Sequence, residues 1–405
     1  MKRKCASLLA LLVLPACATA HLDTQGADEH TARAHRVLAT TPLVDGHNDL
    51  PWAIRTDESA PMDVAAYDLR GRTPGHTDID RLRQGRVGIQ FWSVYVPSRA
   101  VEEGAARVQL EQMDIAKQLF ARYPDVFRET LTADAAVAAF REGYIASVMG
   151  MEGGHAIENS LGALRAYYDL GARYLTLTHS ENTDWADASS DTPRHNGLSE
   201  FGKEVVREMN RLGMIVDLSH VSPATMHAAL DVSEAPVIFS HSSARGVTDH
   251  PRNVPDDVLR RMPENGGVVM ITFVPGFISS EVARWSEQPE EYRRANPAPR
   301  ATLADVVRHI EHVRDVAGID HVGIGGDYDG ISTVPTGLED VSTYPALLAE
   351  LSRRGWSETD LRKLTGENAL RAWREAERVA ARLRSERGPS TATIQQLDGA
   401  AVRGR

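Results

Sequence analysis

Histidine and carboxylate side chains stand at the ends of six short apolar runs in this chain: His47 with Asp49, Glu152, His179, His220, His241 and Asp327. Imidazole nitrogens and carboxylate oxygens bind divalent metal ions, which activate water and polarise carbonyl groups. Parallel strands that close into a barrel bring their carboxyl ends to one rim, so residues far apart in sequence meet there. The pattern therefore predicts a metal-dependent hydrolase built on a barrel.

The first and third runs supply three of the candidate ligands. His47 and Asp49 lie two residues apart and project from the same face of a strand, although such a pair alone is more often simply hydrogen-bonded. Glu152 ends the buried run SVMGME, where an uncompensated carboxylate is costly and calls for a cation. An arginine partner or a helix cap is the alternative for Glu152, and we favour the ligand role. His155 is expected to be structural.

Two further candidates end neighbouring runs. His220 closes MIVDLSH and His241 closes PVIFSH, with one short helix expected between them, so their imidazoles should be neighbours on adjacent strands. One such histidine would usually be a core residue, but two at equivalent positions indicate ligands. With His47, Asp49 and Glu152 they make five mixed nitrogen and oxygen donors, enough for two divalent ions if Glu152 bridges them.

His179 and Asp327 are not needed as ligands for two metal ions, so each could instead bind the substrate or transfer a proton. Asp327 lies in the glycine-rich stretch GIGGDYDG, which could also be read as a phosphate-binding loop. No following helix with Lys and Ser/Thr supports nucleotide binding, so we discount it. Asp329 is expected only to shape this loop.

The elements that must position these residues alternate between strand and helix patterns, which predicts an α/β fold, a TIM-type (β/α)8 barrel with extended βα loops. The expected strands are residues 42–49, 87–96, 145–152, 173–179, 214–220, 236–241, 267–273 and 321–327. The expected helices are residues 105–123, 132–141, 160–170, 199–212, 223–230, 255–262 and 301–317.

One domain is expected over residues 41–380. Ser222 followed by Pro223 supplies a capping hydroxyl and a preset φ where a helix should start. Two long loops, residues 182–198 and 274–300, should lie over the active rim as lids or as surface insertions without consequence. Residues 382–405 are rich in Arg, Ser, Gly and Thr, and we expect a disordered tail there.

The amino-acid composition and net charge limit the classes of molecule that this protein could bind. The chain has 405 residues, 42% hydrophobic and 25% charged, as in ordinary folded proteins. Its formal net charge of -11, with no Lys/Arg-rich stripe, argues against a nucleic-acid partner and favours a small-molecule substrate.

Residues 1–20 have a basic start, an apolar stretch and a small-residue exit, which predicts a signal peptide. Leu14-Pro15-Ala16-Cys17 resembles a lipoprotein box with Cys17 as the lipidated residue, and Ala18-Thr19-Ala20 offers an ordinary cleavage site instead. We favour the lipoprotein, exported to the periplasm or anchored to a bacterial membrane. Cys5 is the only other cysteine and lies in the signal, so no disulfide can form within one mature chain.

Seven motifs occur in the order and at the spacing of the membrane (renal) dipeptidase family of zinc peptidases, which the chain resembles over most of residues 41–380. They are GHNDLPW, EGGHAI, YLTLTHSENT, DLSHVS, FSHSSAR, RNVPDDVLR and GIGGDYDG. The resemblance implies hydrolysis of the amide bond of dipeptides that have a free amine and a free carboxylate. It also implies tolerance of a C-terminal D-residue, and in some members the opening of β-lactam rings.

The resemblance also implies a role for each site residue. His47 and Asp49 would hold one zinc ion, His220 and His241 the other, and Glu152 would bridge them. The remaining three would serve the substrate: His179 at the substrate or tetrahedral intermediate, Arg252 at its carboxylate, and Asp327 at its amine and the transferred proton. By its position in the sequence alone, Arg252 would be a surface arginine.

Several alternatives stay open. Mn²⁺ or Co²⁺ could replace zinc at such ligands. A phosphotriesterase-like enzyme, lactonase or deacylase is disfavoured, because Asp49 stands where many of those have a second histidine and no lysine lies at a strand end. An N-acyl-D-amino-acid hydrolase is harder to exclude, and a non-catalytic peptide-binding lipoprotein has no support because all proposed ligands are intact. The body lacks cysteines, so a disulfide-linked dimer is not implied, but a homodimer without one is possible.

Overall fold

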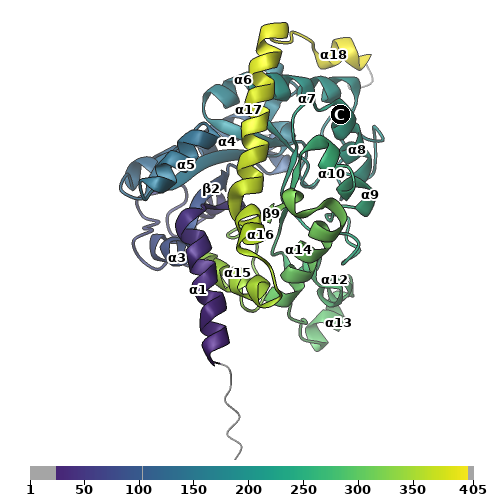
Figure 1. Ribbon diagram of the computed structural model, residues 1–405. Coiled ribbons are helices and arrows are strands. Elements are labelled where there is room, and N and C mark those ends of the chain that lie inside the picture. The colour runs from purple at the N-terminus through teal and green to yellow at the C-terminus, as the bar shows by residue number, and fades with distance from the viewer. Residues whose placement is uncertain (1–23, 103, 400–405) are drawn as a thin grey trace, which may run out of the picture.

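Parallel strands form a closed barrel in the computed structural model, which describes residues 24–102 and 104–399 (Figure 1). The sheet order is β2-β1-β9-β8-β7-β6-β5-β4-β3, and an additional pairing of β2 with β4 closes the ring. The strands are β1 Leu43–Asn48, β2 Val87–Ser93, β3 Phe127–Glu129, β4 Ile145–Glu152, β5 Ala172–Thr176, β6 Ile215–Asp217, β7 Ile238–Ser242, β8 Val268–Ile271 and β9 Val322–Ile324.

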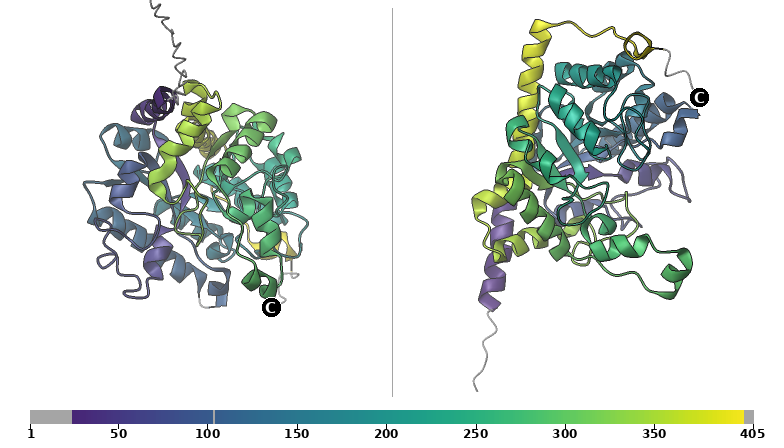
Figure 2. Two further views of the ribbon diagram at one scale, coloured as in Figure 1. Left: turned by 90° about the horizontal axis from the view of Figure 1, so that it is seen from below. Right: turned by 90° about the vertical axis from the view of Figure 1, so that its right-hand side faces the viewer.

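Helices surround this barrel, as the view from below in Figure 2 shows. All eight predicted strands are present, and the predicted (β/α)8 barrel is confirmed. The helices that follow the strands are α4 Ala105–Arg122, α5 Ala133–Arg141, α6 Leu161–Asp169, α7 Glu200–Leu212, α8 Pro223–Val232, α9 Asp256–Leu259, α10 Met262–Asn265, α14 Leu303–Ala317, α15 Tyr344–Arg353, α16 Glu358–Arg362 and α17 Asn368–Glu386. Shorter or additional helices are α1 Thr24–Thr40, α2 Leu50–Arg55, α3 Ile79–Gln84, α11 Pro275–Ile278, α12 Ser280–Ser286, α13 Glu290–Ala295 and α18 Ile394–Leu397.

Single helical turns link several of these elements. They are the 3₁₀ turns Ser98–Glu102, Gly154–Ile157, Ile319–His321 and Val341–Thr343, and the π turn Lys363–Glu367.

Local chemistry explains where several helices start or break. The Ser222 hydroxyl accepts the Thr225 N–H at 3.2 Å, and Pro223 is the first residue of α8, as predicted. The helix predicted over residues 255–262 is instead two single turns, α9 and α10, because Pro263 enters the second one and cannot donate a backbone hydrogen bond to the first. The strand β3 was not predicted, since three residues are too short to show an alternating pattern.

Ordered structure extends beyond residues 41–380 at both ends. The helix α1 packs on α15, and His30 Nδ1 lies 2.8 Å from Ser352 Oγ. The prediction of a disordered tail is wrong for residues 382–399, because α17 continues to Glu386 and α18 packs on α7. Asp398 accepts the Ser199 hydroxyl at 2.7 Å and Ile394 is buried, so specific contacts outweigh the polar composition.

The predicted signal peptide, with Cys17, lies outside the described residues. Within the described residues, no helix combines the length and apolar content that a membrane span needs.

Candidate active site

The predicted ligands converge on the carboxyl-terminal rim of the barrel. His47 and Glu152 lie within β1 and β4, and His241 lies within β7. Asp49 immediately follows β1. His220 and Asp327 were predicted to end strands, but they lie three residues past β6 and β9 and have positive φ values of 70° and 64°. His179 likewise lies three residues past β5. The strands therefore end earlier than the sequence suggested, and tight turns carry the last side chains back over the barrel.

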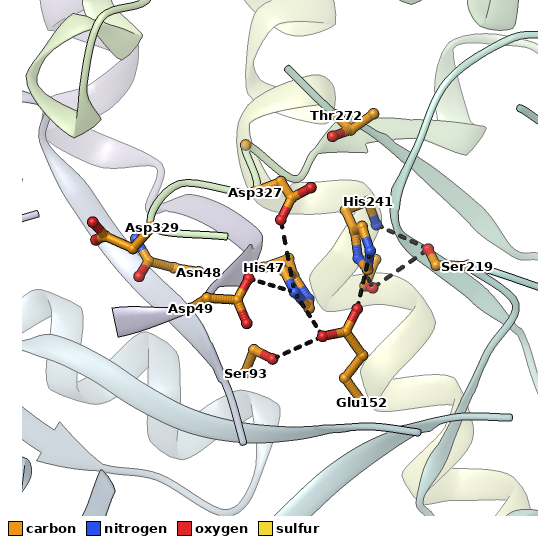
Figure 3. A network of polar contacts seen from close by, with 12 residues as sticks. His47, Asn48, Asp49, Ser93, Glu152, Ser219, His241, Thr272, Asp327 and Asp329 are labelled. Carbon is orange, nitrogen blue, oxygen red and sulfur yellow. Dashed lines mark hydrogen bonds and ion pairs between the residues drawn. The ribbon is translucent and has the colours of Figure 1, made fainter. Parts of the chain in front are cut away.

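Glu152 lies at the centre of this cluster (Figure 3). Its Oε1 is 2.9 Å from His220 Nε2 and 3.3 Å from His241 Nε2. Its Oε2 faces the other side, 3.5 Å from His47 Nε2. The same Oε1 is 3.9 Å from His179 Nε2. The two oxygens of one carboxylate thus contact different imidazoles, His47 through Oε2 and His220 with His241 through Oε1, which is the arrangement that a bridging ligand needs.

His47 also belongs to a second group of donors. Its Nε2 is 3.1 Å from Asp49 Oδ2 and 4.0 Å from Asp327 Oδ1. Across the cluster, three overlapping sets each keep their donor atoms within 4.8 Å of one another. They are His47, Glu152 and His241; Glu152, His179 and His220; and His47, Asp49 and Asp327.

The donor set fits divalent metal ions. His47 Nε2, which faces the Asp49 and Glu152 carboxylates, is buried and has no hydrogen-bond partner among the described residues. A buried polar atom without a partner is costly, and a lone pair that faces carboxylate oxygens gains a partner when a cation is bound between them. Imidazole nitrogen and carboxylate oxygen together suit zinc and also manganese or cobalt. His47, Asp49, Glu152, His220 and His241 are the residues that would hold the ions.

Buried hydrogen bonds fix the orientation of two of these imidazoles. His47 Nδ1 is 3.0 Å from the Tyr174 hydroxyl, which itself lies 3.2 Å from the Gly46 carbonyl. If the hydroxyl donates to that carbonyl, His47 Nδ1 must carry the proton, and Nε2 then presents its lone pair to the cluster. Such partners raise ligand basicity and hold ring orientation.

A similar chain supports His241. Its Nδ1 is 2.8 Å from Ser240 Oγ, and Ser240 Oγ donates to Asp217 Oδ2 at 2.7 Å. Asp217 also accepts the Ser240 and Ser219 backbone N–H groups at 2.8 and 3.1 Å. Sequence analysis missed these residues. Asp217 could have been predicted from the sequence, because it is a carboxylate inside the apolar run MIVDLSH. Tyr174 has no such feature and looks like an ordinary core residue.

Burial and charge shift the pKa values in opposite directions across the site. Burial opposes the charged form of His47, but Tyr174 and the Asp49 and Glu152 carboxylates raise its pKa well above the usual value. Burial dominates at His220 and His241 and lowers their pKa values far below that of free histidine. The lowered pKa values favour neutral His220 and His241 with free lone pairs, as metal binding requires, whereas His47 would have to give up a proton when an ion binds.

The two central carboxyl groups also differ. Burial opposes ionisation of Glu152, but His47, His220 and His241 outweigh it and hold the Glu152 pKa well below its usual range. Burial, with the Asp49 and Glu152 charges, raises the pKa of Asp327 well above its usual range. Glu152 is therefore suited to remain an anion and Asp327 to carry a proton.

A cavity of about 280 Å³ lies above the cluster and has distinct walls. Trp52 and Tyr95 meet edge to face at 4.9 Å, and Tyr95 lies 4.7 Å from the His179 ring, forming one wall. Arg252 lines the same cavity, is only 6% exposed, and lies 3.5 Å from Ser242 Oγ and 3.4 Å from the His241 carbonyl. Burial lowers the Arg252 pKa to about 10. An arginine this buried is not the surface residue that its sequence position suggests.

The turn after β9 brings Asp327 to this cavity. A Cβ atom on Gly330 would collide with the Asp49 and Asp327 carboxylates, so only glycine fits there. Asp329 accepts the His76 N–H at 2.6 Å and shapes the loop, as expected. His155 belongs to none of the three donor sets, and burial lowers its pKa to about 4.

The two long loops differ in their relation to the site. Residues 182–198 fold around Asp187, whose carboxylate accepts the N–H groups of Arg194, His195 and Gly197. Residues 274–300 contain α11, α12 and α13, and Val274 and Phe277 from this insertion line the catalytic cavity.

Comparison with known proteins gives consistent results. Residues 31–387 match the family model described as membrane dipeptidase, peptidase family M19. An uncharacterized dipeptidase of Schizosaccharomyces pombe is 49% identical over 360 residues, which cover 85% of this chain and 83% of that protein.

Solved structures agree with this match. The probable dipeptidase PvdM from Pseudomonas aeruginosa has a TM-score of 0.76 and 26% identity, covering 87% of this chain and 100% of that one. A Rhodobacter sphaeroides metallopeptidase, liganded with a phosphinate mimic of the dipeptide L-Ala-D-Ala, has a TM-score of 0.73 and 28% identity, covering 83% of this chain and 99% of that one. The resemblance seen in the seven motifs is confirmed, and the chain belongs to the membrane dipeptidase family, peptidase family M19, whose members are metal-dependent dipeptidases.

Proposed function

We propose that this enzyme binds two divalent ions, zinc in the first instance, and hydrolyses dipeptides that have a free N-terminal amine and a free C-terminal carboxylate. The observation that carries the proposal is the position of Glu152, whose two oxygens face His47 on one side and His220 with His241 on the other. Asp49 adds a second carboxylate on the His47 side. Five donors in this arrangement suit two ions that share one carboxylate.

Two ions held there would supply Lewis acidity toward water and toward the scissile amide. The residues around them then define the substrate. Arg252 presents a planar fork that pairs with a substrate carboxylate through two hydrogen bonds. A bound carboxylate would replace the solvation that burial removes from the Arg252 guanidinium, which only the Asp327, Glu152 and Asp217 charges otherwise offset.

We assign Asp327 to binding the substrate amino group and to transferring the proton to the departing amine. Burial and the neighbouring carboxylates raise its pKa, which favours the protonated carboxyl that can release a proton to the departing amine. His179 projects over Glu152 from the next strand and is assigned to the substrate or to the negative charge that develops on the carbonyl oxygen. The edge-to-face pair Trp52 and Tyr95 closes the cavity on that side and limits water access.

Tolerance of a C-terminal D-residue is part of the proposal. It is supported by the similarity to the Rhodobacter sphaeroides protein, whose ligand mimics L-Ala-D-Ala. Steady-state assays with matched L-L and L-D dipeptides, an N-acyl-D-amino acid and a carbapenem test it. Turnover of the acylated compound in preference to free-amine dipeptides would assign the chain to the N-acyl-D-amino-acid hydrolase reaction instead.

The decisive experiment combines metal analysis with one substitution. In Asp327→Asn we expect about two metal ions per chain to be retained and hydrolysis to be largely lost. Normal activity in that variant would remove Asp327 from the mechanism. One ion per chain in the wild-type enzyme would reject the binuclear site.

We also propose export and anchoring through Cys17, which is supported by the signal-like composition of residues 1–20. Metabolic labelling with palmitate should mark the wild-type chain and leave Cys17→Ala unlabelled. Release of both proteins into the soluble periplasmic fraction, without label, would reject the anchor. A homodimer remains a prediction, which light scattering on the purified chain tests.

A further inference from the structure

A second and larger cavity adjoins the catalytic one. It has a volume of about 870 Å³, against about 280 Å³ for the cavity above the metal ligands. The two have four lining residues in common: Val274, Phe277, Gly330 and Ile331. These four residues, here called the shared wall, come from the segments that follow β8 and β9, and they line both spaces.

The larger cavity, here called the side chamber, is built by the insertion that follows β8. Val282, Ala283 and Trp285 of α12 line it from one side, and Val334 lines it from the loop after β9. Two charged residues of its lining, Glu287 and Arg300, are exposed to solvent. The lining is therefore mostly apolar, with the polar residues Ser286, Ser332 and Thr333 at exposed positions and the two charged residues toward the solvent.

The volumes suggest that the catalytic cavity alone is a tight site. Small-molecule sites usually measure about 300–1,000 Å³, so 280 Å³ lies at the lower limit. A dipeptide with two small side chains suits such a space, but a large side chain needs more room. The side chamber is the adjoining space with an apolar lining, and apolar side chains gain most from leaving water there.

The contact between Arg252 and Phe277 indicates which end of the substrate faces the side chamber. The Arg252 guanidinium carbon lies 5.3 Å from the centroid of the Phe277 ring, and Phe277 also stacks on His250 at 4.4 Å. A substrate carboxylate held by Arg252 would place the Cα atom of the C-terminal residue beside Phe277. The side chain of that residue would then lie along the shared wall, because Phe277 lines both cavities, whereas Trp52 and Tyr95 line only the catalytic cavity.

We propose that the side chamber is a specificity subsite that receives a large apolar side chain of the C-terminal residue of the dipeptide. The enzyme would thus prefer substrates such as Ala-Phe over Ala-Ala. This inference rests on the proposed dipeptidase function and on Arg252 as the carboxylate anchor. Apolar pockets discriminate by about 10- to 200-fold per group that they accept or exclude, so kcat/KM for Ala-Phe should exceed that for Ala-Ala at least tenfold.

Filling the side chamber tests the proposal. Gly276 lines the chamber, and a Cβ atom placed on it would meet nothing within 4 Å, so Gly276→Trp adds bulk without a clash at the backbone. Ala283→Trp fills the chamber from α12 and guards against a folding defect in either variant alone. Leu170→Trp is the matched control, because Leu170 is 39% exposed and lines neither cavity.

The readout is the ratio of kcat/KM for Ala-Phe to kcat/KM for Ala-Ala, with Phe-Ala as a third substrate. We expect the ratio to fall about tenfold in Gly276→Trp and Ala283→Trp and to stay unchanged in Leu170→Trp. An unchanged ratio in both filled variants overturns the proposal, and so does a selective loss on Phe-Ala, which would assign the chamber to the other residue. If the metal-loaded wild-type enzyme cleaves none of the three dipeptides, the proposed function itself fails.

Discussion

The hydrogen bond between Tyr174 and His47 provides a sharp test of the metal site. Tyr174→Phe removes one oxygen from a fully buried ring that packs against Phe91 at 5.5 Å, and the ring itself can stay in place. The lost hydroxyl is 3.0 Å from His47 Nδ1 and 3.2 Å from the Gly46 carbonyl. Tyr174 lines neither cavity, so the change acts on the substrate only through His47.

Two effects of this change can be estimated. Loss of a partner that orients a metal-binding histidine usually weakens metal affinity about 10- to 100-fold, equivalent to about 1.4–2.8 kcal/mol. His47 Nδ1 is also left in a buried setting without its partner, which should lower the free energy of unfolding of the metal-free chain by about 1–3 kcal/mol. At saturating metal, kcat should recover to near the wild-type value.

Activity measured across a series of metal buffers gives the affinity, and urea denaturation of the chelated protein gives the stability. Tyr123→Phe is the control, because Tyr123 is also buried and its hydroxyl lies away from the candidate metal ligands. That hydroxyl donates to Asp68 at 3.0 Å and accepts from the Leu69 N–H at 2.9 Å and from Arg122 Nε at 3.3 Å. An affinity in Tyr174→Phe equal to that of Tyr123→Phe would show that His47 is not a ligand held by Tyr174.

Three further predictions concern the substrate anchor, the close approach at the ligands, and stability. Arg252→Lys keeps a charge but loses the two-pronged fork, so kcat/KM for dipeptides should fall about 10- to 100-fold; an equal fall for C-terminally amidated dipeptides would contradict the anchor role. Gly330→Ala should lower metal content and activity with little change in far-UV circular dichroism, since its Cβ would collide with the Asp327 carboxylate, and full activity would contradict that packing. Burial opposes the charge of Glu208, but Arg211, at 2.8 Å, contributes to holding its pKa below the usual value. A lowered folded-state pKa stabilises the protein above about pH 4.3 and the benefit is lost as pH falls further, so the Tm difference between wild type and Glu208→Gln should shrink from pH 6 to pH 3; a constant difference would contradict this.

Sequence reasoning located the candidate metal ligands because their chemistry is local. A carboxylate at the end of a buried apolar strand costs free energy unless a positive charge lies beside it, and Glu152 is the clearest case. The barrel follows from the same strands, since repeated strand and helix alternation leaves few parallel arrangements. The short strand β3 escaped prediction because three residues show no alternating pattern, and the helix predicted over residues 255–262 is broken at Pro263 into α9 and α10.

Other parts of the site depend on contacts that no local pattern encodes. Arg252 looked like a surface residue, and only the packing of the β7 loop against Phe277 buries it. Nothing in the sequence distinguishes Tyr174 from other core aromatic residues, and only the closed barrel brings its hydroxyl to within 3.0 Å of His47 Nδ1. The tail beyond residue 382 has a polar composition, yet Asp398 and Ile394 dock it on α7.

The amino-acid sequence alone determined which side chains can bind metal and that parallel strands would carry them to one rim. Residue type and the two-residue period of a strand are properties of the local chain, so they can be read without coordinates. The tertiary structure decided which carboxylate lies between the imidazoles, which groups orient them, and that a larger apolar chamber opens beside a small catalytic cavity. Those features arise from distances between residues far apart in the chain, which the closure of the barrel and the packing of the β8 insertion set.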